Sequence, residues 1–179
     1  MANRSYLYAA DSLPTADDIP RPVRCVSEHA WDVPLAHLLL AGHGTAAAPS
    51  MIWNPPVGLT ADYDPGADLL LGLLRLVGEG EIADREDFDA MVLRTAQHLE
   101  KQRSRHFLLE PGEIFSLVED DLDTAAQDLI DTRIEPAVTR ARSALDGREA
   151  AWLDELRKDW STHFASFYAD HLYYSFPTD

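Results

Sequence analysis

The feature that most constrains the fold is a short leucine-rich stretch with helix start and stop signals at its ends. Asp64 can cap a helix because its side-chain oxygen accepts free N–H groups of the first turn. Pro65 suits the first helical position, where its missing N–H costs nothing, and Gly78 suits the end because it readily adopts the left-handed conformation. From Leu69 to Val77 apolar side chains point in nearly every direction, so this helix must be buried on most sides.

The length of this stretch decides what buries it. The thirteen residues from 65 to 77 are too few to cross a bilayer, which takes about 20. We therefore predict that the stretch is the central helix of a globular core. A chain of 179 residues with 46% hydrophobic residues is typical of one folded domain, and we expect that domain to span residues 1–179.

The remaining patterns predict an α+β fold that is mostly helical, with five or six helices around the leucine-rich helix and a small antiparallel sheet from the N-terminal half. Residues 3–9 and 23–28 alternate as strands do, and only a loop separates them, so we expect them to pair. Residues 42–50 read as a surface loop. The short extended pieces 51–53 and 57–59 flank prolines, which confines them to a sheet edge or a loop.

Apolar residues at helical spacing predict the other helices. We expect helices from Trp31 to Gly42, from Asp84 onwards, from Pro111 onwards and over 148–171, with Pro136 breaking or restarting the third of these. Residues 106–110 predict a brief strand. The aromatic tail after His171 is expected to pack back on the body.

The net charge is the most informative property of the overall composition. Fifteen Lys and Arg residues against 31 Asp and Glu residues give a net charge of −16. Phosphate backbones and anionic membrane surfaces repel such a protein, so we expect neither a nucleic acid nor a membrane as partner. A basic protein would be attracted and steered in. The alternative is that the acidity serves only solubility.

The acidic residues are densest after Pro111. Between Glu110 and Glu135 there are nine acids against Arg133 alone. At about 100° per residue, four of them lie opposite the apolar stripe of the expected helix. They are Glu113, Asp120, Asp123 and Asp131. This side is either solvated surface or a docking face for a basic partner.

Three places in the sequence have the residue types of a metal or nucleophilic site. Glu155, Asp159 and His163 stand at i, i+4 and i+8, but metal sites usually draw ligands from several elements, so we expect a paired surface strip and no metal. The single cysteine, Cys25, lies in a strand pattern and reads as a small buried hydrophobe. His43, in a Gly-His-Gly turn, reads as plain surface.

Sequence motifs of the common cofactor and hydrolase sites are absent. The chain contains no Gly-x-Gly-x-x-Gly, Walker-type loop, Gly-x-Ser-x-Gly or Cys-x-x-Cys, so we expect no cofactor. An enzyme would have to assemble its site through the fold. The residues for such a site are Glu28, His29, Glu110 and Glu113.

Three stretches carry a resemblance to a known group of proteins. They are Met-Ala-Asn-Arg-Ser-Tyr-Leu-Tyr at 1–8, Ser-Glu-His-Ala-Trp-Asp-Val-Pro at 27–34, and Phe-Leu-Leu-Glu-Pro-Gly-Glu-Ile-Phe at 107–115. With these, the chain resembles a family of uncharacterised bacterial proteins, a resemblance that implies no activity. The polar and aromatic residues of these stretches are candidates for a functional cleft. They are Arg4, Glu28, His29, Trp31, Glu110 and Glu113.

Together these observations favour a non-enzymatic, cytoplasmic protein-binding domain, for which an immunity-type protein that neutralises a basic toxin is one form. The cytoplasm follows from the lone cysteine and from the lack of a basic-then-apolar leader. The rivals are an enzyme built from the four residues named above and an acidic housekeeping protein with no dedicated binding face. The specific partner and the oligomeric state stay open.

Overall fold

The fold is built on one five-stranded antiparallel sheet. The structure is a computed structural model that describes residues 3–54, 57–118, 121–164 and 168–176. The strands are β1 Arg4–Ala10, β2 Val23–Ala30, β3 Ala46–Ala48, β4 Gly58–Asp62 and β5 His106–Glu110. Their order across the sheet is β2-β1-β5-β4-β3. The predicted α+β class is confirmed.

The first two strands pair with each other as their alternation predicts. Tyr6 lies opposite Glu28, and Leu7 lies opposite Ser27. The register shifts by one residue between Leu7 and Tyr8, so that Tyr8 faces Cys25. Neighbouring side chains in a strand point to opposite faces, and this pairing therefore separates Tyr6 and Glu28 from Leu7 and Ser27.

The middle of the N-terminal half is more regular than its composition indicates. Residues 46–48, expected as loop, form the edge strand β3. The piece at 57–59, expected at an edge or in a loop, leads into β4, which lies inside the sheet between β5 and β3. Prolines 55 and 56 precede the strand, so every residue from Gly58 to Asp62 keeps the N–H that the ladder needs.

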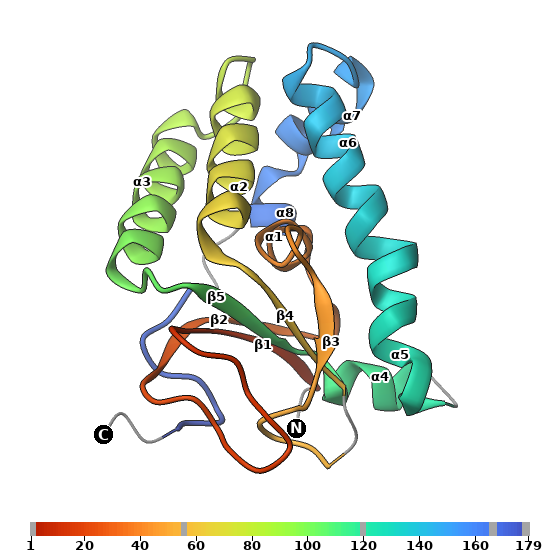
Figure 1. Ribbon diagram of the computed structural model, residues 1–179. Coiled ribbons are helices and arrows are strands. Elements are labelled where there is room, and N and C mark those ends of the chain that lie inside the picture. Colours follow the sequence, from red (N-terminus) through yellow and green to blue (C-terminus); the bar gives the residue numbers. More distant parts are fainter. Residues whose placement is uncertain (1–2, 55–56, 119–120, 165–167, 177–179) are drawn as a thin grey trace.

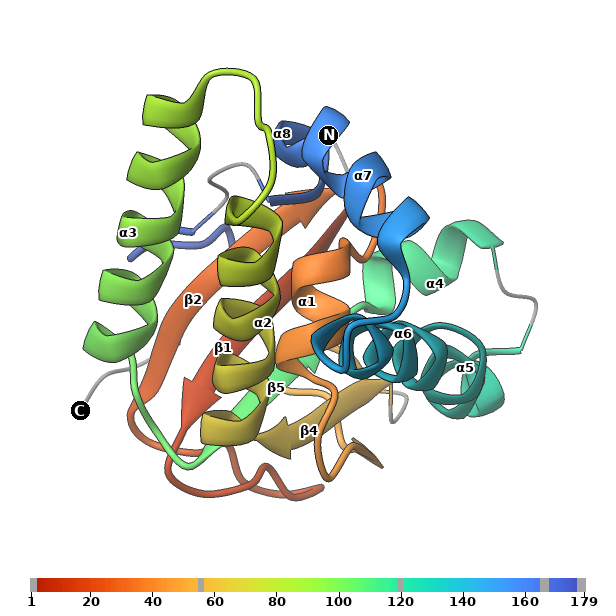
Figure 2. The same ribbon diagram turned by 90° about the horizontal axis from the view of Figure 1, so that it is seen from above.

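Apart from α4, which lies at the end of the sheet beside the start of β1, the helices cover one face of this sheet (Figures 1 and 2). The helical segments are α1 Leu35–Leu40, α2 Tyr63–Gly78, α3 Arg85–Lys101, α4 Gly112–Val118, α5 Leu122–Leu129, the π-helical turn η1 Ile130–Ile134, α6 Glu135–Leu145, α7 Ala150–Lys158 and α8 Trp160–Phe164. The helix predicted over 148–171 is wrong in its extent. The backbone leaves helical geometry at Asp159 (φ −130°) and restarts as the short α8. Among the described helices, none is long and apolar enough to cross a membrane.

The leucine-rich helix α2 is the central helix, as predicted. It contacts α1, α3, α6 and α7. Its inner side chains are fully buried: Leu70, Leu73, Leu74 and Val77. Its backbone comes so close to α1 that a Cβ on Gly66 would lie 2.1 Å from the Leu40 carbonyl oxygen. A side chain there would force the two helices apart.

The start of α2 differs from the expected cap. The helix begins at Tyr63, so Asp64 lies in its first turn. Its carboxylate accepts two hydrogen bonds from the Arg103 guanidinium, each 3.0 Å long. Asp64 therefore favours the start of α2 through its charge near the helix N-terminus and ties α2 to the loop before β5.

Loops and the C-terminal tail cover the other face of the sheet. A small apolar cluster there joins Tyr6, Tyr8 and Leu108 of the sheet to Leu172 of the tail. The Tyr8 hydroxyl donates a 2.9 Å hydrogen bond to the Tyr174 carbonyl. The prediction that the tail packs back on the body is confirmed.

Candidate docking surface

A long outer helix provides the first part of the candidate site. The segments α5, η1 and α6 follow one another without a break from Leu122 to Leu145 and form what we call the long helix. Proline in a helix lacks an N–H and collides with the carbonyl four residues earlier. The π-helical turn Ile130–Ile134 comes immediately before Pro136, and its wider i→i+5 spacing accommodates the missing bond. Of the two outcomes predicted at Pro136, the break is wrong, whereas α6 starts at Glu135 with Pro136 in its first turn, as a restart requires.

Exposed carboxylates mark the outer side of this helix, which we call the acidic surface. They are Asp121, Asp123, Asp128, Asp131 and Glu135. Asp121 also caps the helix, accepting a 2.9 Å hydrogen bond from the Asp123 N–H. Within the described residues none of the five carboxylates forms an ion pair. Their charge is left uncompensated at the surface.

The basic residue nearest to the centre of this surface is already engaged. The Arg133 guanidinium donates to both carboxylate oxygens of Asp32, at 2.8 and 3.3 Å, and to the Val33 carbonyl at 2.8 Å. This fork binds the long helix to the turn between β2 and α1. Because Asp32 neutralises Arg133, the surface around it stays negative.

The structure places the four residues expected on the acidic side in different surroundings. Asp123 and Asp131 lie on the acidic surface, and Asp120 lies outside the described residues. Glu113 is not on this surface, because α4 is a separate helix from α5. Its carboxylate accepts a 2.7 Å bond from the Arg4 N–H and a 3.3 Å bond from the Tyr6 hydroxyl.

The second part of the candidate site is an aromatic corner, made of Arg4, Glu28, Trp31 and Tyr173. Arg4 Nε lies 3.6 Å from Glu28 Oε1, and its guanidinium lies 5.9 Å from the centre of the Tyr173 ring. Glu28 Oε2 in turn accepts a 3.0 Å bond from the Tyr173 N–H. The sequence had singled out three of these four residues, and the fold brings them together.

Two large aromatic side chains project from this corner. Trp31 is 63% exposed and Tyr173 is 56% exposed. Trp31 has a positive φ of 71°, which is strained for a residue other than glycine, and its N–H donates a 2.7 Å bond to the Asn3 carbonyl. Strained backbone of this kind concentrates at functional sites.

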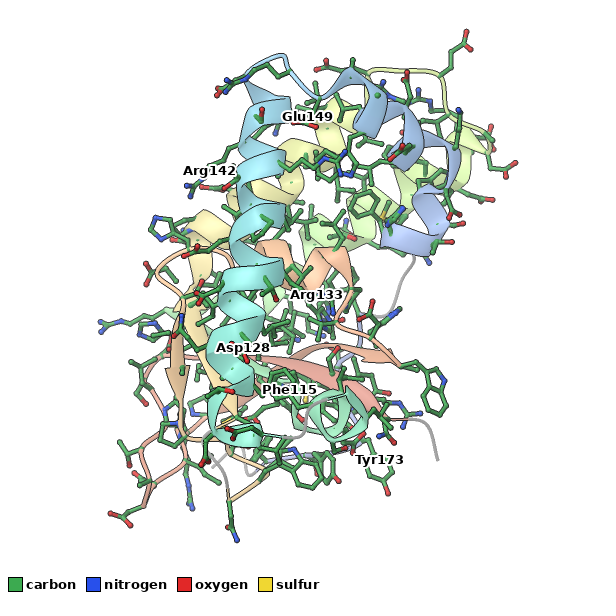
Figure 3. All side chains as sticks on the ribbon, turned by 90° about the vertical axis from the view of Figure 1, so that its right-hand side faces the viewer. Phe115, Asp128, Arg133, Arg142, Glu149 and Tyr173 are labelled. Atoms are coloured by element: carbon green, nitrogen blue, oxygen red, sulfur yellow. The ribbon has the colours of Figure 1, made fainter. Side chains whose placement is uncertain are left out.

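The corner and the acidic surface adjoin. Trp31 directly precedes Asp32, which pairs with Arg133 of the long helix. Figure 3 shows Asp128 and Arg133 on the long helix, whereas Tyr173 lies apart from this helix, beyond Phe115 of α4. In Figures 1 and 2 the tail that carries Tyr173 and the long helix lie on opposite sides of the molecule. The part of the corner that adjoins the acidic surface is therefore Trp31, and we treat the acidic surface with this end of the corner as the candidate docking surface.

Three of the four residues of a possible enzyme site, Glu28, Glu110 and Glu113, meet around Tyr6, and the fourth lies on the other face of the sheet. Glu28 and Glu110 flank Tyr6 from the two neighbouring strands and share its face. His29 lies opposite Ser5 and therefore points to the helix-covered face. These residues do not gather around one of the clefts that the described residues form.

Glu110 is the most buried of these acids. It is 2% exposed, and its carboxylate accepts a 2.5 Å bond from the Ser50 hydroxyl and a 2.7 Å bond from the Met51 N–H. Burial raises the pKa of Glu110 to about 7, although both hydrogen bonds oppose that rise. The side chain anchors the loop before β4 to the sheet.

A buried histidine that the sequence did not single out joins the sheet to α1. His37 is fully buried, with Nε2 2.7 Å from the Ser27 hydroxyl and Nδ1 3.2 Å from the Ser5 hydroxyl. Burial lowers the pKa of His37 to about 3. The neutral ring therefore links β1, β2 and α1 and is closed to solvent. The sequence signal for its burial is that His37 is the single polar residue in the apolar run from Leu35 to Ala41.

The strip of Glu155, Asp159 and His163 is interrupted, because Asp159 lies between α7 and α8. Among the described residues, no group of three His, Cys, Asp or Glu side chains is placed to hold a metal ion. Cys25 is half-buried in β2. Burial raises the pKa of its thiol, which makes the nucleophilic thiolate scarce at neutral pH.

These features define an acidic α+β fold in whose described residues no group of three His, Cys, Asp or Glu side chains is placed to hold a metal ion. The comparison with family models matches residues 11–155 to a domain of unknown function, DUF7822. The match covers most of the chain, and the protein therefore belongs to this family. The comparisons with curated proteins and with solved structures find no match.

Proposed function

We propose that the protein is a binding domain that docks a basic protein on the acidic surface and anchors it at the aromatic corner. The observation that carries this proposal is the set of five exposed carboxylates without a basic partner in the described chain. Fields of one sign accelerate the approach of an oppositely charged protein.

Acidic residues can also stabilise the helix that carries them, but this explanation accounts for only some of the five carboxylates of the acidic surface. Asp121 and Asp123 lie at the N-terminus of the long helix, where negative charge is favourable. Asp131 and Glu135 lie in its middle, four residues apart, where like charges cost a few tenths of a kcal/mol. A partner's basic groups would remove this repulsion.

The aromatic corner supplies the apolar contact that charge alone lacks. Trp, Tyr and Arg are the residue types most enriched among the side chains that dominate binding energy. Trp31, Tyr173 and Arg4 are such side chains, and the ion pair of Asp32 with Arg133 holds the Trp31 end of the corner beside the acidic surface. A partner steered by the acidic surface would thus reach Trp31 first.

A bacterial immunity-type protein that neutralises a basic toxin is the form of this function that we favour. The small size and the net charge of −16 support it, as does the absence of the common catalytic motifs from the sequence. The proposal places the protein in the cytoplasm, where a lone cysteine stays reduced.

The test begins with co-purification of the tagged protein from its own host and identification of the bound proteins. Association and dissociation rates of the purified pair are then measured at low and high salt. The association rate should exceed the unsteered range of roughly 10⁵–10⁶ M⁻¹s⁻¹ and fall steeply with salt, whereas dissociation should change little.

Matched variants separate this surface from general acidity. Asp123→Lys with Asp131→Lys should slow association, and Asp17→Lys with Glu81→Lys should change it much less, because Asp17 and Glu81 lie in loops away from the long helix. Trp31→Ala should speed dissociation at least tenfold. Equal association rates for the two charge-reversal pairs would contradict the proposal.

A further inference from the structure

A cleft on the other side of the long helix holds a group of polar side chains of which the docking proposal uses only Glu135. It has a volume of about 390 Å³, which is within the range of small-ligand pockets. One wall is the turn at 42–45 after α1, and the other is formed by η1 and α6. Figure 3 shows Arg142 of this wall and Arg133 on opposite sides of the helix.

An oriented histidine lies on the first wall. His43 Nδ1 is 2.9 Å from Asp62 Oδ2, and the Asp62 N–H donates a 2.8 Å bond to the His43 carbonyl. Since Nδ1 faces the carboxylate, Nε2 is the ring nitrogen left for a ligand. A carboxylate that orients a histidine in this way is typical of functional sites.

A glycine makes this arrangement possible. Gly44 has a φ of +62°, and a Cβ there would lie 2.6 Å from Asp62 Oδ2. A larger residue would be strained by its backbone and would displace the carboxylate. The turn that read as plain surface in the sequence therefore holds His43 and Asp62 in one geometry.

The second wall carries opposite charges at its two ends. Glu135 and Arg142 lie seven residues apart on α6, with Thr139 between them, and all three line the cleft. Seven residues of helix rise about 10 Å. Neither Glu135 nor Arg142 forms an ion pair with another described residue. Both charges are available to a ligand.

The charges exclude a simple anion site. Two carboxylates, those of Glu135 and Asp62, lie in or beside a cleft whose cation is Arg142. Their field, together with the net charge of −16, opposes a multiply charged anion such as phosphate. A zwitterion avoids this cost, because its cationic end can face Glu135 while its carboxylate forms a fork with Arg142.

We propose that this cleft binds a short peptide of two or three residues through both of its free termini. The carboxylate binds Arg142, the ammonium group binds Glu135, and the Thr139 hydroxyl and His43 Nε2 face the peptide backbone. An extended tripeptide spans about 10 Å, which matches the rise between the two charged residues. The site shares Glu135 with the acidic surface, and its other three side chains belong to the cleft alone.

The test uses L-Ala-L-Ala-L-Ala, its N-acetyl derivative and its C-terminal amide as probes. Binding is measured by calorimetry and by amide chemical shifts of residues 42–45 and 135–142. The free tripeptide should bind, and blocking either end should weaken binding about tenfold or more, equivalent to about 1.4 kcal/mol. Sodium phosphate should displace the peptide only weakly.

Two variants assign each end of the peptide to its partner. In Arg142→Gln the free peptide and its C-terminal amide should bind equally, because the variant has already lost the contact that the amide blocks. In Glu135→Gln the free and N-acetylated peptides should bind equally for the same reason at the other end. Arg75→Gln and Asp131→Asn are the matched controls, and both should bind like the wild type.

Three outcomes would overturn the proposal. They are no shift change at about 10 mM free tripeptide, equal binding of the free and blocked peptides to the wild type, and displacement by phosphate at equal concentration. The last result would identify an anion site at Arg142. Since Asp131→Asn tests the acidic surface and leaves the cleft intact, failure here does not bear on the docking of a basic protein.

Discussion

Helices cover one face of the sheet, whereas loops and the C-terminal tail cover the other. The helix-covered face packs mainly through apolar side chains, whereas the tail-covered face also forms hydrogen bonds to the segments that cover it. Under the helices, Leu7, Ala9, Phe107 and Leu109 of the sheet meet side chains such as Leu73 in one large apolar core. On the opposite face the cluster is smaller. Its tyrosines donate hydrogen bonds to the tail and to α4 through their hydroxyl groups.

The difference follows from where backbone hydrogen bonds can be made. A helix satisfies most of its own N–H and C=O groups, so an apolar sheet face is a sufficient partner for it. A loop brings unpaired backbone groups that must find partners when they are buried. Glu110 accepts the Met51 N–H and Tyr8 donates to the Tyr174 carbonyl for this reason.

The largest expected effect is on the helix-covered face. Leu73→Asp should prevent soluble folding, because it buries an unpaired charge in the apolar core, and Leu73→Ala should lower the free energy of unfolding by about 2–5 kcal/mol. Urea unfolding followed by circular dichroism measures both. Arg75→Ala, on the exposed side of the same helix, should change stability by about 0.5 kcal/mol or less. A Leu73→Asp monomer with native-like melting would show that α2 is not central.

On the opposite face, stability should depend on pH through Glu110. Its pKa is raised from 4.5 to about 7 in the folded protein, so between these values the folded state retains a proton that the unfolded state has lost. The stabilisation is complete below about pH 4.5 and falls by about 1.4 kcal/mol per pH unit until about pH 7.

Glu110→Gln provides the control, because Gln resembles the protonated acid and does not titrate. Urea unfolding of both proteins between about pH 5 and pH 8 should show the wild type losing stability relative to the variant up to about pH 7 and remaining parallel to it above. Parallel curves over the whole range would mean that Glu110 is already ionised in the folded protein at pH 5.

A pair of tyrosines compares the two covers directly. Tyr8→Phe removes the bond to the Tyr174 carbonyl of the tail, and Tyr63→Phe removes a 2.6 Å bond to the Leu99 carbonyl at the end of α3. Each should cost about 1 kcal/mol. Hydrogen exchange should then accelerate in residues 169–176 only for Tyr8→Phe, because the tail has fewer other contacts. Equal hydrogen-exchange protection of residues 169–176 in both variants would show that the tail is held no more weakly than the helices.

The smallest effect is expected from metal removal. Neither cover has a group of metal ligands in its described residues, so EDTA should leave the melting temperature unchanged. A fall of several degrees that a divalent ion reverses, and that His163→Ala abolishes, would instead assign a site to Glu155, Asp159 and His163.

Local patterns in the sequence were sufficient for the helix-covered face. The apolar stretch from Leu69 to Val77 is enough to place α2 at the centre, because a helix that is apolar all round has no other stable environment in water. The alternation in β1 and β2 likewise predicts their pairing. The aromatic tail after His171 predicts that this segment is covered.

Local patterns failed in two places. Pro136 predicts a break or a restart of the helix, and the chain avoids a break through the π-helical turn at Ile130–Ile134 immediately before it, a change of helix type that apolar periodicity does not encode. Pairing with β4 turns residues 46–48 into a strand although their composition reads as loop, so that here a neighbouring strand offset a weak local preference.

The sequence by itself determined the fold class, the central helix and the excess of negative charge, because these depend on composition and on short-range periodicity. Only the tertiary structure decided which polar groups act together. It brought Arg4 to Tyr173, Asp32 to Arg133 and His43 to Asp62. Two of these three pairs are separated by more than one hundred residues, and no periodic pattern encodes which distant side chains come within hydrogen-bond reach once the chain has packed.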